Sequence, residues 1–306
     1  MHFLGFKWNN NNFSPFIQYT DVPNVGEVKF KDLKAGSVVN IEIEKKKFCT
    51  GYFSDPGYEK KLCEYKSELP PGSSFQCDSC RFHDSALFLP LGALKDYQKE
   101  VIEKQEHLNY INLFGKDIYK TGVAAKVRKY TRIHEQGAHA SLFFTECNGV
   151  VTREIEEFIS RNLSIKQSVN VLAKIKSVYD YPSKEEASKK LHAMYSEIIK
   201  ILPERYKQYL LKEPEFVYNI DFYSLKDKGG IIYEVKDIHN ISGTIKSIIG
   251  ELLVLVDSKN RLLALNSKLI LGYVIHIYEN NTFQPIPLEN LREIVLESST
   301  KNLTLF

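Results

Sequence analysis

The chain has 306 residues, of which 43% are hydrophobic and 26% charged, so it is long enough to bury a sizeable core. No apolar run reaches the eighteen or so residues that a membrane-spanning helix needs, which excludes a helical integral membrane protein. The net charge of +3 is too small to indicate nucleic-acid binding by itself. The first residues, MHFLGFKWNNNNF, show no basic segment followed by an apolar stretch, so a cytoplasmic protein without a secretory signal is expected.

Residues 1–48 contain short apolar runs separated by turn residues, among them GEVKFKDL and SVVNIEIEKKKF. Runs of this kind predict β-strands. These N-terminal strands are expected to lead into zinc-binding loops at residues 49–85.

Four of the five cysteines fall within residues 49–80, namely Cys49, Cys63, Cys77 and Cys80. The last two form the tight knuckle CDSC, and thirteen residues lie between the members of each earlier pair. A Cys-x-x-Cys knuckle brings two thiolates to one tetrahedral metal ion, and the two earlier cysteines can complete the set. The pattern therefore predicts a structural zinc site.

Two disulfides or unconnected buried thiols are the alternatives to zinc. A reducing compartment disfavours disulfides. The loops TGYFSDPGYEKKL and SELPPGSSFQ hold too few apolar residues to build a core, so a zinc ion would supply folding energy there. His83 is close enough to Cys80 to act as a substitute ligand, whereas Cys147 is expected to be a packing residue.

Residues 106–164 carry the clearest order of elements, which is strand, strand, helix, strand, helix. NYINLF and IYKTGV are two short strands joined through GKD, close enough for a hairpin. The helix AKVRKYTRIHEQ follows and ends at Gly137, which suits a left-handed C-cap. SLFFTE is the third strand, and TREIEEFISRNL is a second helix expected to begin at Thr152.

The rest of the chain divides into a helical segment and a strand-rich region. Residues 165–212 are predicted to be helical, with EEASKKLHAMYSEIIKIL as the clearest amphipathic run, ended by Pro203. Residues 216–306 return to strands, with a hairpin around DSKN and a further strand in LGYVIHIY. The fold class expected is α+β, and residues 216–306 are expected to form a small β-barrel-like region that the N-terminal strands could complete.

Basic residues gather between residues 116 and 132, where Asp117 is the single acid beside Lys116, Lys120, Lys126, Arg128, Lys129 and Arg132. At helical spacing the two arginines share a face, and two guanidinium groups suit bidentate capture of phosphate oxygens. A solvated helix face is the alternative interpretation.

The second helix of this region carries carboxylates at informative positions. Its buried stripe includes Ile155 and Ile159, which places Glu157 nearly opposite and leaves Glu154 and Glu156 at the two edges. An edge carboxylate can face a cleft and hold Mg²⁺ or Mn²⁺, which prefer oxygen ligands. Ordinary edge acids are commoner, and the choice between Glu154 and Glu156 stays open.

The order of these elements resembles the GIY-YIG nuclease fold, in which two tyrosine-bearing strands precede a helix with an arginine and a later helix with a metal-binding glutamate. The resemblance places Tyr110, in NYINL, at the tyrosine of the first half-motif, and Gly122, in YKTG, at the glycine of the second. It implies that the arginine of the family falls on Arg132 or Arg128, and its glutamate on Glu156.

This chain departs from that pattern at three positions. Lys120 stands where the second tyrosine belongs, and Tyr119 is displaced by one residue, which turns its side chain to the opposite face of a strand. Asn109 stands at the glycine of the first half-motif. Lys120 could still bind phosphate, together with Tyr119, Arg128 and Lys129, but a tyrosine general base becomes doubtful.

A second resemblance covers nearly the whole chain. It rests on Cys49 and Cys63, followed by QCDSC, YINLFGKDIYKTGV, RIHEQGAHA, TREIEEFIS and GTIKSIIGELLVLVD. This series resembles a prokaryotic family of unknown function that is numbered 2797. The resemblance implies a cytoplasmic, zinc-containing protein with a GIY-YIG-like domain, and it brings no known substrate.

Three functions remain open on the sequence. The first is a metal-dependent nuclease that hydrolyses the phosphodiesters of DNA or RNA, with Tyr110, Arg132 and Glu156 as catalytic residues and Mg²⁺ or Mn²⁺ as cofactor. The second is a zinc-containing nucleic-acid-binding protein without catalysis, which Lys120 and the basic cluster favour. The third is an interaction scaffold whose C-terminal strands bind a protein partner.

Overall fold

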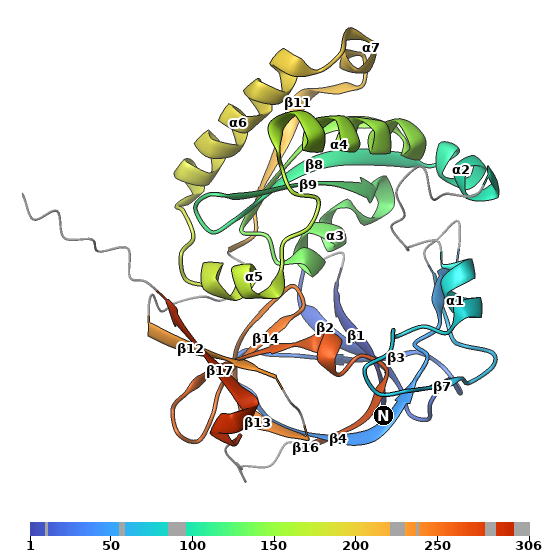
Figure 1. The fold of residues 1–306 in the computed structure, drawn as a ribbon, viewed down its shortest axis with the longest axis vertical. Coiled ribbons are helices and arrows are strands. Elements are labelled where there is room, and N and C mark those ends of the chain that lie inside the picture. Colours follow the sequence, from blue (N-terminus) through green and yellow to red (C-terminus); the bar gives the residue numbers. More distant parts are fainter. Residues whose placement is uncertain are drawn as a thin grey trace, which may run out of the picture.

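The computed structural model describes residues 1–9, 12–54, 59–84, 96–220, 230–236, 239–278 and 286–296. The chain is of the mixed α+β class, as predicted, with a four-stranded sheet in one part and a long curved sheet in the other (Figure 1). Within the described residues, no helix has both the length and the apolar character needed to cross a membrane.

The long sheet joins strands from both ends of the sequence. Eleven strands belong to it, in the order β17-β12-β15-β14-β13-β4-β16-β1-β2-β3, with β7 paired to β4. Their bounds are β1 His2–Trp8, β2 Pro15–Thr20, β3 Lys29–Asp32, β4 Val38–Phe48, β7 Glu68–Leu69, β12 Gly230–Val235, β13 Asn240–Ile249, β14 Leu252–Val256, β15 Leu262–Asn266, β16 Tyr273–Tyr278 and β17 Leu291–Leu296. The N-terminal β4 lies between two C-terminal strands, β13 and β16.

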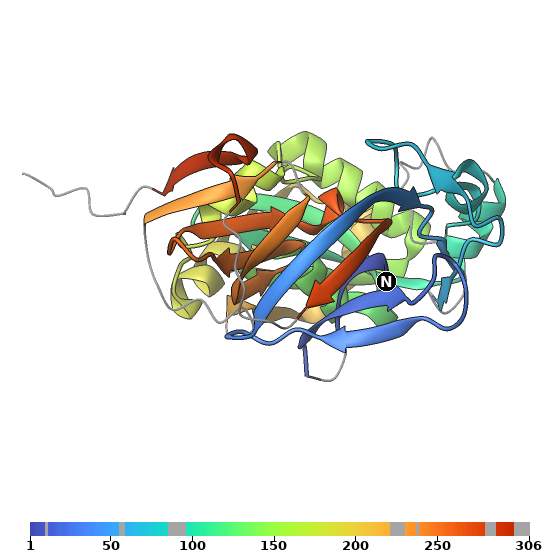
Figure 2. The same ribbon diagram turned by 90° about the horizontal axis from the view of Figure 1, so that it is seen from below.

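The expected small C-terminal barrel is therefore wrong for the described residues. The sheet does not close, because β17 and β3 lie at its two ends. The N-terminal strands do complete the C-terminal strands, as expected, since β13 pairs with β4 and β16 pairs with both β4 and β1. The result is one open, curled sheet, which Figure 2 shows from below.

The hairpin predicted around DSKN is present between β14 and β15. The side chain of Asp257 closes its turn by accepting hydrogen bonds from the backbone N–H groups of Lys259 and Arg261, at 3.0 and 2.8 Å. The core of the long sheet is aliphatic and includes Ile41, Val254 and Leu263, all at most 2% exposed. Helix α5 (Val171–Ser177) packs Ile175 into the same core.

The four-stranded sheet contains the predicted order of strand, strand, helix, strand, helix. Its elements are β8 Glu106–Phe114, β9 Ile118–Ala125, the short 3₁₀ helix Lys126–Arg128, α3 Lys129–Gln136, β10 Ala140–Asn148 and α4 Gly149–Leu163. Helix α3 ends at Gly137, which has a positive φ of 73° as expected for a C-cap. Helix α4 begins at Gly149 rather than Thr152, because the Asn148 side chain caps the N–H groups of Val150 and Val151.

A fourth strand, β11 (Leu210–Tyr218), completes this sheet in the order β11-β10-β8-β9. It begins inside residues 165–212, which were expected to be helical, and it pairs with β10. That segment otherwise holds α5, α6 (Lys184–Ile201) and α7 (Glu204–Lys207). Helices α4 and α6 cover one face of the sheet, and α3 lies on the other face, toward the long sheet (Figure 1).

Two glycines let α3 approach the long sheet closely. A Cβ on Gly137 would press on the carbonyl of Ile249, and a Cβ on Gly250 would press on the backbone of Gly137. Both glycines have positive φ angles, of 73° and 60°. This close contact holds α3 between the two sheets, where its side chains face the junction of the two parts of the molecule.

The cysteine-rich segment packs beside this junction. It consists of the ladder of β5 (Tyr52–Ser54) and β6 (Glu59–Lys61), the strand β7, and the short helix α1 (Asp78–His83). Helix α2 (Asp96–Glu103) then leads into β8. Residues 85–95, which precede α2, lie outside the described residues.

Candidate functional site

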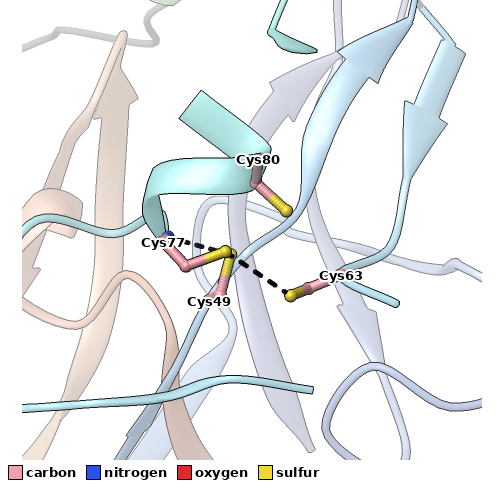
Figure 3. A group of neighbouring side chains, drawn as sticks. All are labelled: Cys49, Cys63, Cys77 and Cys80. Carbon is pink, nitrogen blue, oxygen red and sulfur yellow. Dashed lines mark hydrogen bonds between the residues drawn. The ribbon is translucent and has the colours of Figure 1, made fainter. Parts of the chain in front are cut away.

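The four predicted zinc ligands converge in one cluster (Figure 3). Cys77 precedes α1 and Cys80 lies within it, whereas Cys49 follows β4 and Cys63 follows β6. The four Sγ atoms all lie within 4.8 Å of one another, and those of Cys63 and Cys77 are 3.8 Å apart. A tetrahedral zinc ion with Zn–S bonds of roughly 2.3 Å requires Sγ atoms roughly 3.8 Å apart. The cluster could therefore hold a metal ion such as zinc.

The surroundings of the cluster also suit bound thiolates. The backbone N–H groups of Gly51 and Cys77 point at Cys49 Sγ, at 3.4 and 3.3 Å. Burial raises the pKa of Cys49 to about 11, so a metal ion would be needed to hold its thiolate at neutral pH. All five cysteines are free, which argues against the disulfide alternative. His83 contacts the ring of Tyr52 and lies outside the four-sulfur cluster.

A pocket of about 590 Å³ lies where the two parts of the molecule meet. The four-stranded part supplies residues of β8, β9, α3 and α4, and the facing wall comes from β1, the cysteine-rich segment, α5 and the connection between β15 and β16. Seven lysine or arginine side chains line the pocket against four acidic ones. The pocket therefore carries an excess of positive charge.

Tyr110 lies at the inner end of this pocket and is fully buried. It pairs with Gly122 across β8 and β9, and its ring occupies the space that a Gly122 side chain would take. Gln136 on α3 donates a hydrogen bond of 2.8 Å to the Tyr110 hydroxyl. The Asn112 amide donates to Gln136 Oε1 at 3.0 Å, and Ser141 donates to Asn112 at 2.7 Å. This chain of hydrogen bonds fixes both Gln136 and the Tyr110 hydroxyl.

Lys120 projects from β9 into the same pocket, two residues before Gly122 and hence on the same face. Its Nζ lies 3.5 Å from the Tyr110 hydroxyl and 5.3 Å from the centre of the Tyr110 ring. Burial, together with the charge of Arg132, lowers the pKa of Lys120 to about 7. Lys120 thus pays a desolvation cost that an anion in the pocket would reduce.

Glu156 reaches the pocket from α4 and is 2% exposed. Burial raises its pKa to about 7, against the attraction of Lys120, Arg153 and Arg132. Its Oε2 atom is buried without a hydrogen-bond partner among the described residues. A buried carboxylate oxygen of this kind can accept a proton donor or serve as a ligand to a hard divalent cation. Glu154, by contrast, is exposed and accepts a hydrogen bond of 3.0 Å from Tyr206, away from the pocket.

Arg128, at the end of the short 3₁₀ helix, and Arg132, in α3, differ in their ion-pair partners. Arg128 donates two hydrogen bonds to Glu135, at 3.1 and 3.0 Å, and Lys7 of β1 adds a third at 3.1 Å. Arg132 is 3.9 Å from the same carboxylate. Although Glu135 is buried, these three cations lower its pKa to about 2. Arg128 is therefore committed to Glu135, and Arg132 is the arginine whose guanidinium faces Tyr110 and Glu156.

The structure does not bring every predicted residue to the pocket. Tyr119 packs on the opposite face of the sheet, with the hydrophobic cluster under α4 and α6. Lys129 forms an ion pair of 2.6 Å with Glu215 of β11 and does not line the pocket. His134 of the same helix is buried and stacks on Trp8, with ring centres 5.4 Å apart.

Many pocket residues had no place in the site predicted from sequence, among them Gln136, Glu135, Arg153 and Lys174. The first two belong to the EQGA stretch that ends α3, where a helix normally needs no buried polar side chains. The polar EQGA stretch at the end of the helix was the sequence feature that could have indicated these two residues as part of the site. Arg153 is buried and donates to the Gly149 carbonyl at 2.9 Å, and Lys174 comes from α5, whose position depends on long-range packing.

A comparison with protein families gives one match. The sequence pattern of a family described as Protein of unknown function (DUF2797) matches residues 36–275, which is more than half of the chain. The chain belongs to this family. The DUF2797 match includes the four clustered cysteines, the whole four-stranded sheet and Lys174, and it leaves β1, β2 and β3 outside. No curated protein and no solved structure matches the chain.

Proposed function

We propose that this DUF2797 protein hydrolyses phosphodiesters of nucleic acids in the pocket between its two sheets, by a GIY-YIG-like arrangement of residues. One observation carries the proposal: Tyr110, Lys120, Arg132 and Glu156 line a single pocket. They come from β8, β9, α3 and α4, four of the five elements in the order strand, strand, helix, strand, helix that resembles the GIY-YIG fold. Ordinary surface residues would not converge in this way from four separate elements.

Each of these side chains suits a step of phosphodiester hydrolysis. Arg132 would hold the non-bridging oxygens of the phosphate, since a guanidinium offers two parallel donors. The Tyr110 hydroxyl, whose oxygen is held by Gln136, would orient the attacking water. Burial raises the pKa of Tyr110, so the role of a tyrosinate base is not assigned to it.

The buried and unpartnered Oε2 of Glu156 fits a magnesium or manganese ligand. When bound, such an ion would stabilise the negative charge that develops on the phosphate and the leaving oxygen. A separate metal ion, zinc, would have a structural role and would be held by Cys49, Cys63, Cys77 and Cys80.

The proposal is tested by incubating purified protein with single- and double-stranded DNA and RNA, with Mg²⁺, Mn²⁺ or EDTA. Wild-type protein is expected to cleave at least one substrate only with the divalent ion present. Arg132→Met should reduce the rate by roughly 100-fold or more, as loss of a charge-stabilising group does. Arg161→Met is the matched control, because Arg161 is exposed, forms an ion pair with Glu157 and does not line the pocket. Equal loss in both variants would contradict the assignment.

A second candidate function, nucleic-acid binding without catalysis, is favoured by Lys120 at the second tyrosine position. A lysine there adds positive charge and removes a hydroxyl from the site. In this case binding would weaken steeply with salt and need no divalent ion, because displaced counterions drive it. Retention of an oligonucleotide in EDTA, with no cleavage under any metal condition, would support binding over hydrolysis.

A further inference from the structure

The facing wall of the pocket contains groups that the proposed reaction does not use. Two of them are Lys174 on α5 and Phe75 in the loop between Cys63 and Cys77. They come from segments far apart in the sequence, yet they line the same pocket as Tyr110 and Glu156.

Lys174 is a half-buried cation that contacts no carboxylate directly among the described residues. No carboxylate of the described residues lies within 4.0 Å of its Nζ, whereas the neighbouring Lys268 forms an ion pair of 2.9 Å with Glu251. Instead, Lys174 Nζ lies 5.6 Å from the centre of the Phe114 ring. Burial lowers its pKa to about 8. The charge of Glu251 opposes this shift, whereas the charges of Lys268, Lys120 and Arg132 reinforce it. Lys120 and Arg132 thus repel Lys174 while Glu251 attracts it, and a polyanion in the pocket would add to that attraction.

Phe75 presents a large apolar surface in the same pocket. Its side chain is 39% exposed. Its backbone is held in place, since the carbonyl accepts hydrogen bonds from the Thr50 N–H at 2.9 Å and the Thr50 hydroxyl at 3.1 Å. The adjacent Phe53 differs, because Lys7 and Lys60 lie over its ring at 4.7 and 4.6 Å. An exposed aromatic ring on an anchored backbone, beside cations, is the kind of surface on which an unpaired base stacks.

The shape of the pocket excludes a regular duplex from the reacting position. Tyr110 and Glu156 are 0% and 2% exposed, so a phosphate must enter the pocket to reach them. The walls belong to two different sheets, and a volume of about 590 Å³ corresponds to a small ligand. A paired strand carries its partner along, whereas a single strand can place one nucleotide inside and splay its bases.

We propose that the pocket binds single-stranded nucleic acid, with Lys174 contacting a phosphate next to the reacting one and Phe75 stacking on a base. This assignment rests on the proposed function for its substrate class, but it concerns binding alone. The cysteine-rich segment then has a direct role, since it presents Phe75 to the strand.

The test is fluorescence-anisotropy binding of a short, fluorescein-labelled oligothymidylate in EDTA, over a range of salt concentrations. Lys174→Met should weaken binding several-fold and reduce the slope of log K against log salt by roughly 0.7, the value for one lost contact to a single strand. Phe75→Ala should weaken binding by roughly 5-fold or more without changing that slope, because stacking releases no counterions.

Each variant has a matched control. Lys176→Met removes a lysine from the exposed side of the same helix, and Phe82→Ala removes an exposed phenylalanine of α1 that does not line the pocket. Neither control should change binding. The proposal is overturned if Lys174→Met behaves like Lys176→Met, if Phe75→Ala behaves like Phe82→Ala, or if the oligothymidylate–oligoadenylate duplex binds as tightly as the single strand. Tight, Lys174-dependent binding without cleavage under any condition would instead leave this proposal standing and remove the proposed hydrolysis.

Discussion

The ring of Tyr110 lies directly over Gly122 on the neighbouring strand, and a Cβ at Gly122 would overlap both the ring and the hydroxyl oxygen. The absence of a side chain at Gly122 therefore leaves the space that the Tyr110 ring occupies. Because the ring can cross β9 at this point, the Tyr110 hydroxyl reaches Gln136 and comes within 3.5 Å of Lys120 Nζ.

Gly122→Ala is expected to destabilise the protein by about 1–3 kcal/mol, the usual cost of overpacking a buried position. The cost should shrink in a Tyr110→Ala background, since the new methyl group then finds empty space. Urea denaturation of the two single variants and the double variant measures this coupling. An alanine penalty of the same size in both backgrounds would show that the ring does not depend on Gly122.

Glu135 links α3 to β1, because it accepts hydrogen bonds from both Arg128 and Lys7. Glu135→Gln removes a carboxylate that is only 14% exposed and leaves its cations uncompensated, so a loss of about 3 kcal/mol is expected at neutral pH. Glu157→Gln is the matched control, since its pair with the largely exposed Arg161 contributes at most about 0.5 kcal/mol.

The difference between wild type and Glu135→Gln should also depend on pH. The folded state lowers the pKa of Glu135 from 4.5 to about 2. The stability that this carboxylate contributes is therefore fully present above pH 4.5 and is lost as the pH falls toward 2. Denaturation of both proteins across this range should show their stabilities converging with acidification. A difference independent of pH would contradict the ionic role of Glu135.

Removal of the metal should unfold the cysteine-rich segment and leave the sheets more intact. Protein purified without chelator is expected to hold one zinc ion per chain by elemental analysis, and Cys77→Ser should lower both the zinc content and the melting temperature. Cys147→Ser is the matched control, because Cys147 is a buried cysteine of β10 outside the cluster. Full zinc content in Cys77→Ser would argue against the four-cysteine site.

The local part of this fold was predictable because short-range patterns determine it. Gly122 and Lys120 lie two residues apart on β9, so strand periodicity alone places them on one face and Tyr119 on the other. The choice of Glu156 over Glu154 depends on how α4 rests on the sheet, which the helical pattern leaves open.

The pairing of strands that are far apart in the sequence could not be predicted from short-range patterns. The pairing of Asn240 with Glu42 joins strands almost two hundred residues apart, and no turn sequence specifies it. The first part of β11 was missed because charged residues and Pro214 interrupt its apolar pattern, which an edge strand tolerates. The wall that carries Lys174 and Phe75 follows from these long-range contacts.

The account is tested most directly by comparing the cleavage rates of Glu156→Gln and Glu154→Gln on the oligonucleotide that wild-type protein cleaves with Mg²⁺. The two substitutions are chemically identical and lie two residues apart on α4, but only Glu156 lines the pocket. The account predicts that Glu156→Gln loses at least roughly 100-fold in rate while Glu154→Gln keeps the wild-type rate. Equal rates in the two variants would contradict a reaction centred on this pocket.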